Sequence, residues 1–295
     1  MRRKAEFILF LTTFFWASAF IVVKESLHYI QPFTFAALRF LFGALFYFPV
    51  LLLGRHLKGK WFLSREGFLL GLCLALGFLL QTLSLVYTSA SNSAFLTSLF
   101  VIFVPLLGFL IFKEKFSKRI LWGLLLSVVG LYFLSKPDFA QNSVVGLGDF
   151  LSILCALAFA VQIMLISRFT RKGNAVVLAW QQIFWCGFLC AVMALIFESA
   201  SFVELQNNFI IPKVWGGVLY CSLLCTALAF WVQGIYQRHT TDFRATIIYT
   251  VEPVLATIMA VALKQEVVGQ TKVLAFFILF AGILLALEPN KNQMS

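Results

Sequence analysis

Glu252 is the residue of this sequence that is best placed to do chemistry. It is the one charged residue of the stretch Ala245–Leu263, near its middle, and it directly precedes Pro253. Proline has no N–H to donate, so a backbone carbonyl one turn earlier loses its helical partner. The break and the carboxylate could line a path for a proton or a substrate. Alternatively, the carboxylate caps the kink or bonds a neighbouring helix. Tyr249 is one turn earlier on the same face and is a candidate for the wall of such a path.

Arg39 is a second charged residue inside an apolar stretch, the eighth residue counted from Pro32. Its planar fork of N–H donors suits a carboxylate or a phosphate group, so Arg39 is a candidate to hold a substrate. The alternative is that its long side chain reaches the membrane interface or pairs with Glu25. A charge at the centre of a bilayer costs roughly 2.5–3.5 kcal/mol on insertion scales, so each such residue is a site candidate by default.

Three uncharged residues complete the candidates. Gln81 and Gln233 lie in apolar stretches and could hydrogen-bond a substrate or join two helices. Trp16 could form an aromatic wall with Tyr249, although interface belts and lipid contact explain most aromatic residues of membrane segments. The cysteines have no His or carboxylate neighbours of the kind that a metal ion needs. We therefore expect no metal, no cofactor, no catalytic residue and no enzymatic activity.

The elements that position these residues must be membrane helices. Of the 295 residues, 61% are hydrophobic and only 12% are charged, about half the charged fraction of an ordinary soluble domain. The uncharged run Gly67–Phe112 is too long for one helix and divides at the small polar cluster Thr88–Ser93. We predict an all-α polytopic membrane protein with ten transmembrane helices. They start near Glu6, Pro32, Gly67, Ser93, Arg119, Leu147, Ala175, Val214, Arg244 and Thr271.

The positive charges predict the orientation of these helices. With ten helices, one set of loops and ends holds 17 Lys and Arg residues and the other set holds 5, while Arg39 lies inside a helix. The richer side is cytoplasmic by the positive-inside rule, which places both termini in the cytoplasm. The net charge of +11 therefore reports topology, and we expect no nucleic-acid partner.

The chain also matches itself when it is shifted by 152 residues in one region and by 143 in another. The matched positions are Gln81 and Gln233, Thr88 and Thr240, Glu114 and Glu266 at 152, and Trp16 and Phe159, Arg39 and Gln182 at 143. We predict two repeats of five helices, 6–136 and 147–288. Five is odd, so the second repeat enters the membrane in the opposite orientation. Inverted repeats of this kind build alternating-access transporters with a site near the midplane.

Several of these residues resemble one family. The motifs are Trp16-Ala17-Ser18 with Lys24, Pro32 and Arg39, then Glu114 with Gly123 and Gly130, and then Glu252-Pro253 with Glu266 and Gly282. They resemble, in order, the motifs of the ten-helix EamA-type permeases of the drug/metabolite transporter superfamily, over about Glu6 to Leu287. Pro105 and Pro253 depart from the symmetry, because they precede Glu114 and Glu266 by different distances. We therefore expect the fourth helix to bend about one turn away from its counterpart.

The resemblance implies a secondary transporter, often an exporter, in the cytoplasmic (inner) membrane. Amino acids or related amphiphilic compounds fit best, because Arg39 is the only cationic residue inside a predicted span. A carrier of nucleotide- or sugar-type metabolites and a lipid flippase are the alternatives within transport, and a channel or scaffold is the alternative outside it. The expected partners are a small-molecule substrate, protons as a coupling ion, and the lipid bilayer. The sequence leaves the oligomeric state open.

Overall fold

The computed structural model of the chain consists of helices joined by turns over its described residues. These are 2–53, 64–113, 118–135, 146–199 and 212–263, with a few positions between 269 and 285. Eight helical segments among them are long and apolar enough to cross a membrane. Most of the predicted tenth helix, which starts near Thr271, lies outside the described residues. The count of ten helices and the cytoplasmic termini stay predictions.

The helix starts agree closely with the boundaries expected from the sequence. The elements are α1 (Arg2–Ser26), α2 (Pro32–Leu53), α3 (Arg65–Tyr87), α4 (Ala90–Thr97), α5 (Phe100–Phe112), α6 (Lys118–Ser135), α7 (Leu147–Lys172), α8 (Ala175–Phe197), α10 (Pro212–Tyr220), η1 (Cys221–Leu228), α11 (Ala229–Tyr236), η2 (Gln237–His239), α12 (Asp242–Tyr249) and α13 (Glu252–Ala262).

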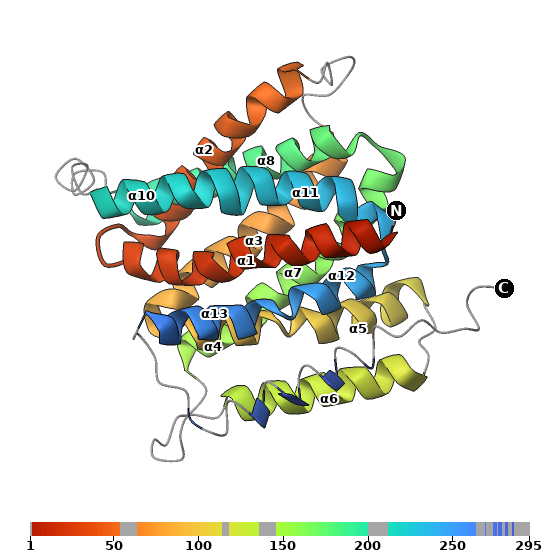
Figure 1. Cartoon of the computed structure of the whole chain (residues 1–295). Helices are drawn as coiled ribbons and strands as arrows, with labels where there is room; N and C mark the ends of the chain where they lie inside the picture. The colour runs from red at the N-terminus through yellow and green to blue at the C-terminus, as the bar shows by residue number, and fades with distance from the viewer. Residues whose placement is uncertain are drawn as a thin grey trace.

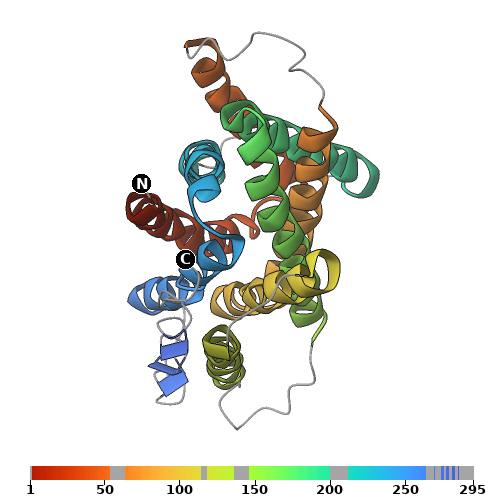
Figure 2. The ribbon, with the colours of Figure 1, turned by 90° about the vertical axis from the view of Figure 1, so that its right-hand side faces the viewer.

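The helices run side by side, and those of the two halves interleave. Figure 1 shows α1 between the α10–α11 rod and the α12–α13 pair, and Figure 2 shows the same neighbours from the side. The first half and the second half also meet where α3 packs on α7 and α8, and where α2 packs on α8 and η1. The helix α6 lies at the edge, against α4 and α5. Helices from both halves therefore surround the centre.

The fourth and ninth predicted helices are each broken into two, and the breaks are equivalent. The segments before the two breaks, α4 and α12, have the same length. The residues that follow them, Ser98 and Thr250, are 152 residues apart. Each donates its hydroxyl to the carbonyl four residues earlier, at 2.9 Å for Ser98 and 3.0 Å for Thr250. Such bonding is known to bend helices.

The expectation about the bend of the fourth helix was wrong. The fourth helix breaks in register with its counterpart, seven residues before Pro105, which lies inside the continuous helix α5. Pro253 lies in the first turn of α13, where a missing N–H costs little. The helix is broken beside Glu252, one turn before Pro253, as the sequence predicted.

The predicted eighth helix contains a wide π-helical turn, η1, between α10 and α11. Its equivalent in the first half, within α3, is regular α-helix. Wide turns of this kind occur often at functional sites. Here the turn carries the Cys225 carbonyl and the Thr226 hydroxyl, which receive hydrogen bonds from Trp16 and Arg39.

Candidate functional site

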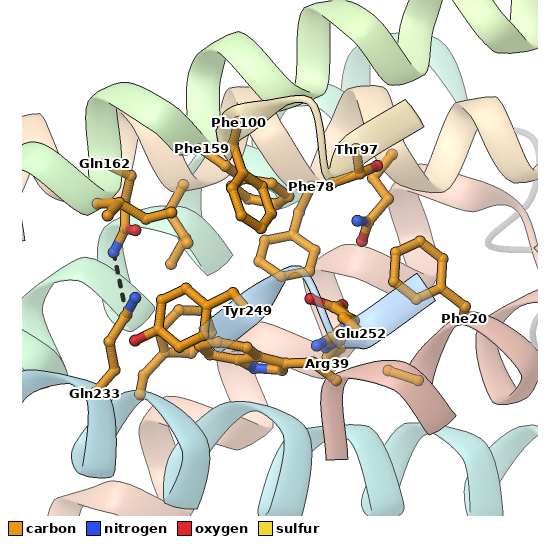
Figure 3. A pocket seen from close by; sticks show the side chains of 16 residues that line it. Phe20, Arg39, Phe78, Thr97, Phe100, Phe159, Gln162, Gln233, Tyr249 and Glu252 are labelled. Atoms are coloured by element: carbon orange, nitrogen blue, oxygen red, sulfur yellow. Dashed lines mark hydrogen bonds between the residues drawn. The ribbon is translucent and has the colours of Figure 1, made fainter. Parts of the chain in front are cut away.

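One cavity at the centre of the helices is lined by all six residues predicted as site candidates (Figure 3). Its lining is Trp16, Ala19, Phe20, Arg39, Leu74, Phe78, Gln81, Thr97, Phe100, Phe159, Gln162, Ile163, Phe230, Gln233, Tyr249 and Glu252. These residues come from α1 to α5 in the first half and from α7, α11, α12 and α13 in the second. No described residue of α6 lines the cavity.

The lining follows the internal repeat. Of the 16 lining residues, 14 form pairs that the shifts of 143 and 152 residues relate. The pairs are Trp16 and Phe159, Ala19 and Gln162, Phe20 and Ile163, Phe78 and Phe230, Gln81 and Gln233, Thr97 and Tyr249, and Phe100 and Glu252. The cavity therefore lies where equivalent parts of the two halves face each other. Its chemistry is not symmetric, because Glu252 and Gln162 have apolar partners.

Glu252 is the first residue of α13, directly after the break, and it is 8% exposed. The partial positive charge at a helix N-terminus favours a carboxylate there. Among the described residues, the Glu252 carboxylate has no hydrogen bond and no ion pair, so neither capping of the kink nor bonding to a neighbouring helix is seen. In Figure 3 the carboxylate lies next to the Arg39 side chain. The position leaves the carboxylate oxygens available to a ligand.

Arg39 is held inside the helices and is only 2% exposed, which excludes the expectation that it reaches to the membrane interface. Its Nε donates to Thr226 Oγ1 at 3.0 Å, and its Nη2 donates to the Cys225 carbonyl at 3.5 Å. The guanidinium also lies over the ring of Phe78, 4.6 Å from the centroid. The wide turn η1 and the rings of Phe78 and Phe40 thus hold the guanidinium in the cavity that Glu252 also lines.

Aromatic rings form the wall of the cavity. The Trp16 ring meets the Tyr249 ring edge-on at 5.1 Å and the Phe230 ring at 5.6 Å. Across the cavity lining, Phe78 meets Phe159 at 5.0 Å. The Trp16 indole N–H donates to the Cys225 carbonyl at 3.1 Å, so its orientation is fixed by the same turn that holds Arg39. Such walls offer apolar surface and ring faces that attract cations.

Gln162 and Gln233 lie at the far end of the cavity from Glu252 (Figure 3). Gln162 Nε2 donates to Gln182 Oε1 at 2.9 Å and to Gln233 Oε1 at 3.3 Å. The Tyr249 hydroxyl donates to Gln237 Oε1 at 3.0 Å. Gln233 therefore joins helices, as its alternative interpretation held, while still lining the cavity. The Gln81 amide group has no hydrogen bond to any described residue.

Some lining residues were not among the predicted candidates, chiefly Gln162 and five phenylalanines. Phenylalanine gives little signal in a chain that contains 35 of them. The internal repeat carried the missing signal, since shifting Trp16 by 143 residues indicates Phe159. Within the described residues, no group of three or more His, Cys, Asp or Glu side chains could hold a metal ion.

Comparison with known proteins shows the family to which the chain belongs. The sequence matches the model of the EamA-like transporter family twice, over residues 3–136 and 146–287. The chain belongs to the EamA-like transporter family. It is a multi-pass membrane protein, as the eight long apolar segments also indicate.

Relatives of this EamA-family protein are named as transporters. An uncharacterized transporter of Archaeoglobus fulgidus is 34% identical over 288 residues, which cover 97% of this chain and 87% of that protein. A probable amino-acid metabolite efflux pump of Salmonella typhimurium is 22% identical and covers 97% and 95%. One solved crystal structure matches with a TM-score of 0.78 at 17% identity over 100% of both chains, which supports the fold alone.

Proposed function

We propose that this EamA-family protein is a secondary transporter that exports small zwitterionic or amphiphilic metabolites, such as amino acids, across the cytoplasmic membrane. It works by alternating access of the central cavity to the two sides. The observation that carries the proposal is that Arg39 and Glu252, two residues of opposite charge, line the same cavity, together with equivalent residues of both halves. Transporters built from inverted repeats bind their substrates at such a place.

The lining suggests how a substrate would lie. A carboxylate of the substrate would meet the Arg39 guanidinium, and an amino group would meet Glu252 and the neighbouring ring faces. The apolar body would lie against Trp16, Phe78 and Phe230. A nucleotide or sugar phosphate carries more negative charge than the single cation of the lining can neutralise. The name of the Salmonella typhimurium relative supports the same substrate class.

We further propose that protons drive the export through Glu252. A carboxylate can bind and release a proton, and this one has no hydrogen bond with a described residue that would hold it in one state. If a proton and a substrate amino group compete for Glu252, entry of a proton from outside displaces the substrate. The exchange then couples the two fluxes.

A growth screen tests the substrate class. Cells that express the protein and cells that do not are challenged with toxic concentrations of amino acids, amines and nucleosides. We expect resistance to a subset of amino acids or amines, and that resistance disappears in the double variant Arg39→Gln/Glu252→Gln. Resistance confined to nucleosides would contradict the proposed substrate class.

A further inference from the structure

Two groups of polar residues hold the halves together at opposite ends of α1. The Glu6 cluster consists of Glu6, Thr240, Arg244 and Arg171. The Asp149 cluster consists of Asp149, Thr88, Asn92 and Lys24. Glu6 and Lys24 are 18 residues apart on one helix, which corresponds to roughly 27 Å. The two clusters therefore lie on either side of the central cavity, near the two faces of the membrane segment.

In the Glu6 cluster, the turn before α12 is held by two helices. The Thr240 hydroxyl donates to Glu6 Oε1 at 3.1 Å, and Arg244 Nη1 donates to the same oxygen at 3.4 Å. The backbone carbonyl of Thr240 accepts a hydrogen bond from Arg171 Nη2 at 3.0 Å. Glu6 is in the first helix of the first half, whereas the turn belongs to the second half, so the two bonds to Glu6 cross between the halves.

In the Asp149 cluster, the turn before α4 is held in the same way. The Thr88 hydroxyl donates to Asp149 Oδ1 at 3.3 Å, and Asn92 Nδ2 donates to the same oxygen. The backbone carbonyl of Thr88 accepts a hydrogen bond from Lys24 Nζ at 2.7 Å. Here the acid is in the second half and the turn is in the first.

The repeat relates the two clusters at three of their four positions, and the fourth, Lys24 or Arg171, is a base in both. The shift of 143 relates Glu6 to Asp149, and the shift of 152 relates Thr88 to Thr240 and Asn92 to Arg244. In each cluster a threonine hydroxyl meets an acid near the start of α1 or α7, and its carbonyl meets a base near the end of the other helix. The inverted repeat thus places the same kind of contact near each face, which is the arrangement that a two-sided gate requires.

Each cluster is linked to the cavity by a short rigid helix. Asn92 is in α4, and the same helix ends at Thr97 in the cavity lining. Arg244 is in α12, which ends at Tyr249 in the lining. Each helix has 8 residues and stops at a break, at Ser98 or Thr250, about which it can turn. A ligand that displaces Thr97 would thus move the Asp149 cluster, and one that displaces Tyr249 would move the Glu6 cluster.

We infer that the Glu6 and Asp149 clusters are the two gates of the transport cycle, opened one at a time. The inference rests on the proposed transport function. Both clusters are formed in this structure. Opening the Glu6 gate moves the turn at Thr240 away from α1 and α7 and admits solvent from the side of the N-terminus. Opening the Asp149 gate moves the turn at Thr88 and admits solvent from the other side.

Sided labelling of the cavity tests the gates without any transport measurement. The six native cysteines are replaced, and Ala19→Cys is introduced as a small reporter in the lining. A membrane-impermeant thiol reagent is then applied to right-side-out and to inside-out vesicles. Glu6→Gln keeps the size of the side chain but removes the charge that Thr240 and Arg244 share, and Asp149→Asn does the same at the other end.

We expect Glu6→Gln to raise the labelling rate from the N-terminal side by roughly tenfold, the order expected for loss of one charge-assisted hydrogen bond. Asp149→Asn should raise it from the opposite side. Glu66→Gln, an acid at the first turn of α3 outside both clusters, is the matched control and should change neither rate. If the cysteine-free chain does not insert, Ala19→Cys is measured in the native background, in which five of the six thiols are buried.

Unchanged labelling in both variants, or an equal rise from both sides in either one, would overturn the inference. The test also separates the two proposals. Sided labelling in a protein that carries no compound would support the gates and contradict transport. Transport with no effect of either substitution on labelling would contradict the gates alone.

Discussion

Glu252 and Phe100 occupy equivalent positions at the starts of α13 and α5, yet only one of them is charged. Both line the cavity and both follow an equivalent break. A repeat that needed these positions only for packing would be expected to keep both apolar, because a charge within the membrane is costly. The asymmetry indicates that the second half provides the carboxylate at this position. The first half provides Arg39 opposite that carboxylate.

One prediction concerns the planar guanidinium group of Arg39. Arg39→Lys keeps the charge but cannot reproduce the bonds from Nε to Thr226 and from Nη2 to the Cys225 carbonyl. We expect the apparent substrate affinity in flux assays to fall by about tenfold, with normal amounts of protein in the membrane. Thr226→Val removes the acceptor for Nε at similar size and should give a smaller loss in the same direction. Wild-type affinity in both variants would show that the position of the guanidinium is unimportant.

The sequence identified six lining residues because polar side chains inside apolar segments have few other roles. It missed the phenylalanines of the wall, since nothing distinguishes them from the phenylalanines that face lipid. It also missed Thr88, Asn92 and Asp149 as a group. Each of these three looks like an ordinary turn or cap residue until the fold brings two distant segments together.

At the scale of the elements, the breaks at Ser98 and Thr250 show what local sequence can and cannot indicate. Proline is the usual cause of a kink, and Pro105 led to the wrong position for the break of the fourth helix. The actual signal is a hydroxyl that donates a hydrogen bond to the carbonyl four residues earlier. This signal is weak, because Ser and Thr residues in membrane helices commonly make the same bond without a break. Here, for example, the Thr12 and Ser152 hydroxyls make this bond inside unbroken helices.

Replacing Pro105 tests this account of the breaks. Because α5 is continuous through Pro105, Pro105→Ala should leave the break of the fourth helix in place. We expect transport within about twofold of wild type and an unchanged or slightly higher melting temperature in detergent, since proline is a poor helix former. A large loss of transport with normal insertion would mean that Pro105 sets the geometry of the cavity after all.

At the scale of the whole molecule, the internal repeat accounts for the cavity, the breaks and the two clusters together. Equivalent residues meet at the centre, where both halves contribute to one lining, and they lie apart at the ends, where each half holds a turn of the other. Inverted repeats arranged in this way are the architecture in which alternating access is known, which supports the proposed function. The sequence predicted the repeat and therefore the correspondence between the two halves. Only the fold shows which residues of one half lie opposite which residues of the other.

Under the proposed function, Glu252 couples a proton gradient to export through the central cavity. Glu252→Gln keeps size and hydrogen bonding but cannot take up a proton, so proteoliposome flux with and without an imposed pH gradient tests this role. The substrate is the compound that the growth screen identifies, and Glu66→Gln is the control for removing an acid elsewhere. We predict that the Glu252→Gln variant inserts normally and exchanges substrate down its own gradient, but shows no acceleration by the pH gradient. Gradient-driven accumulation at the wild-type level would contradict the claim and leave Glu252 with a structural role.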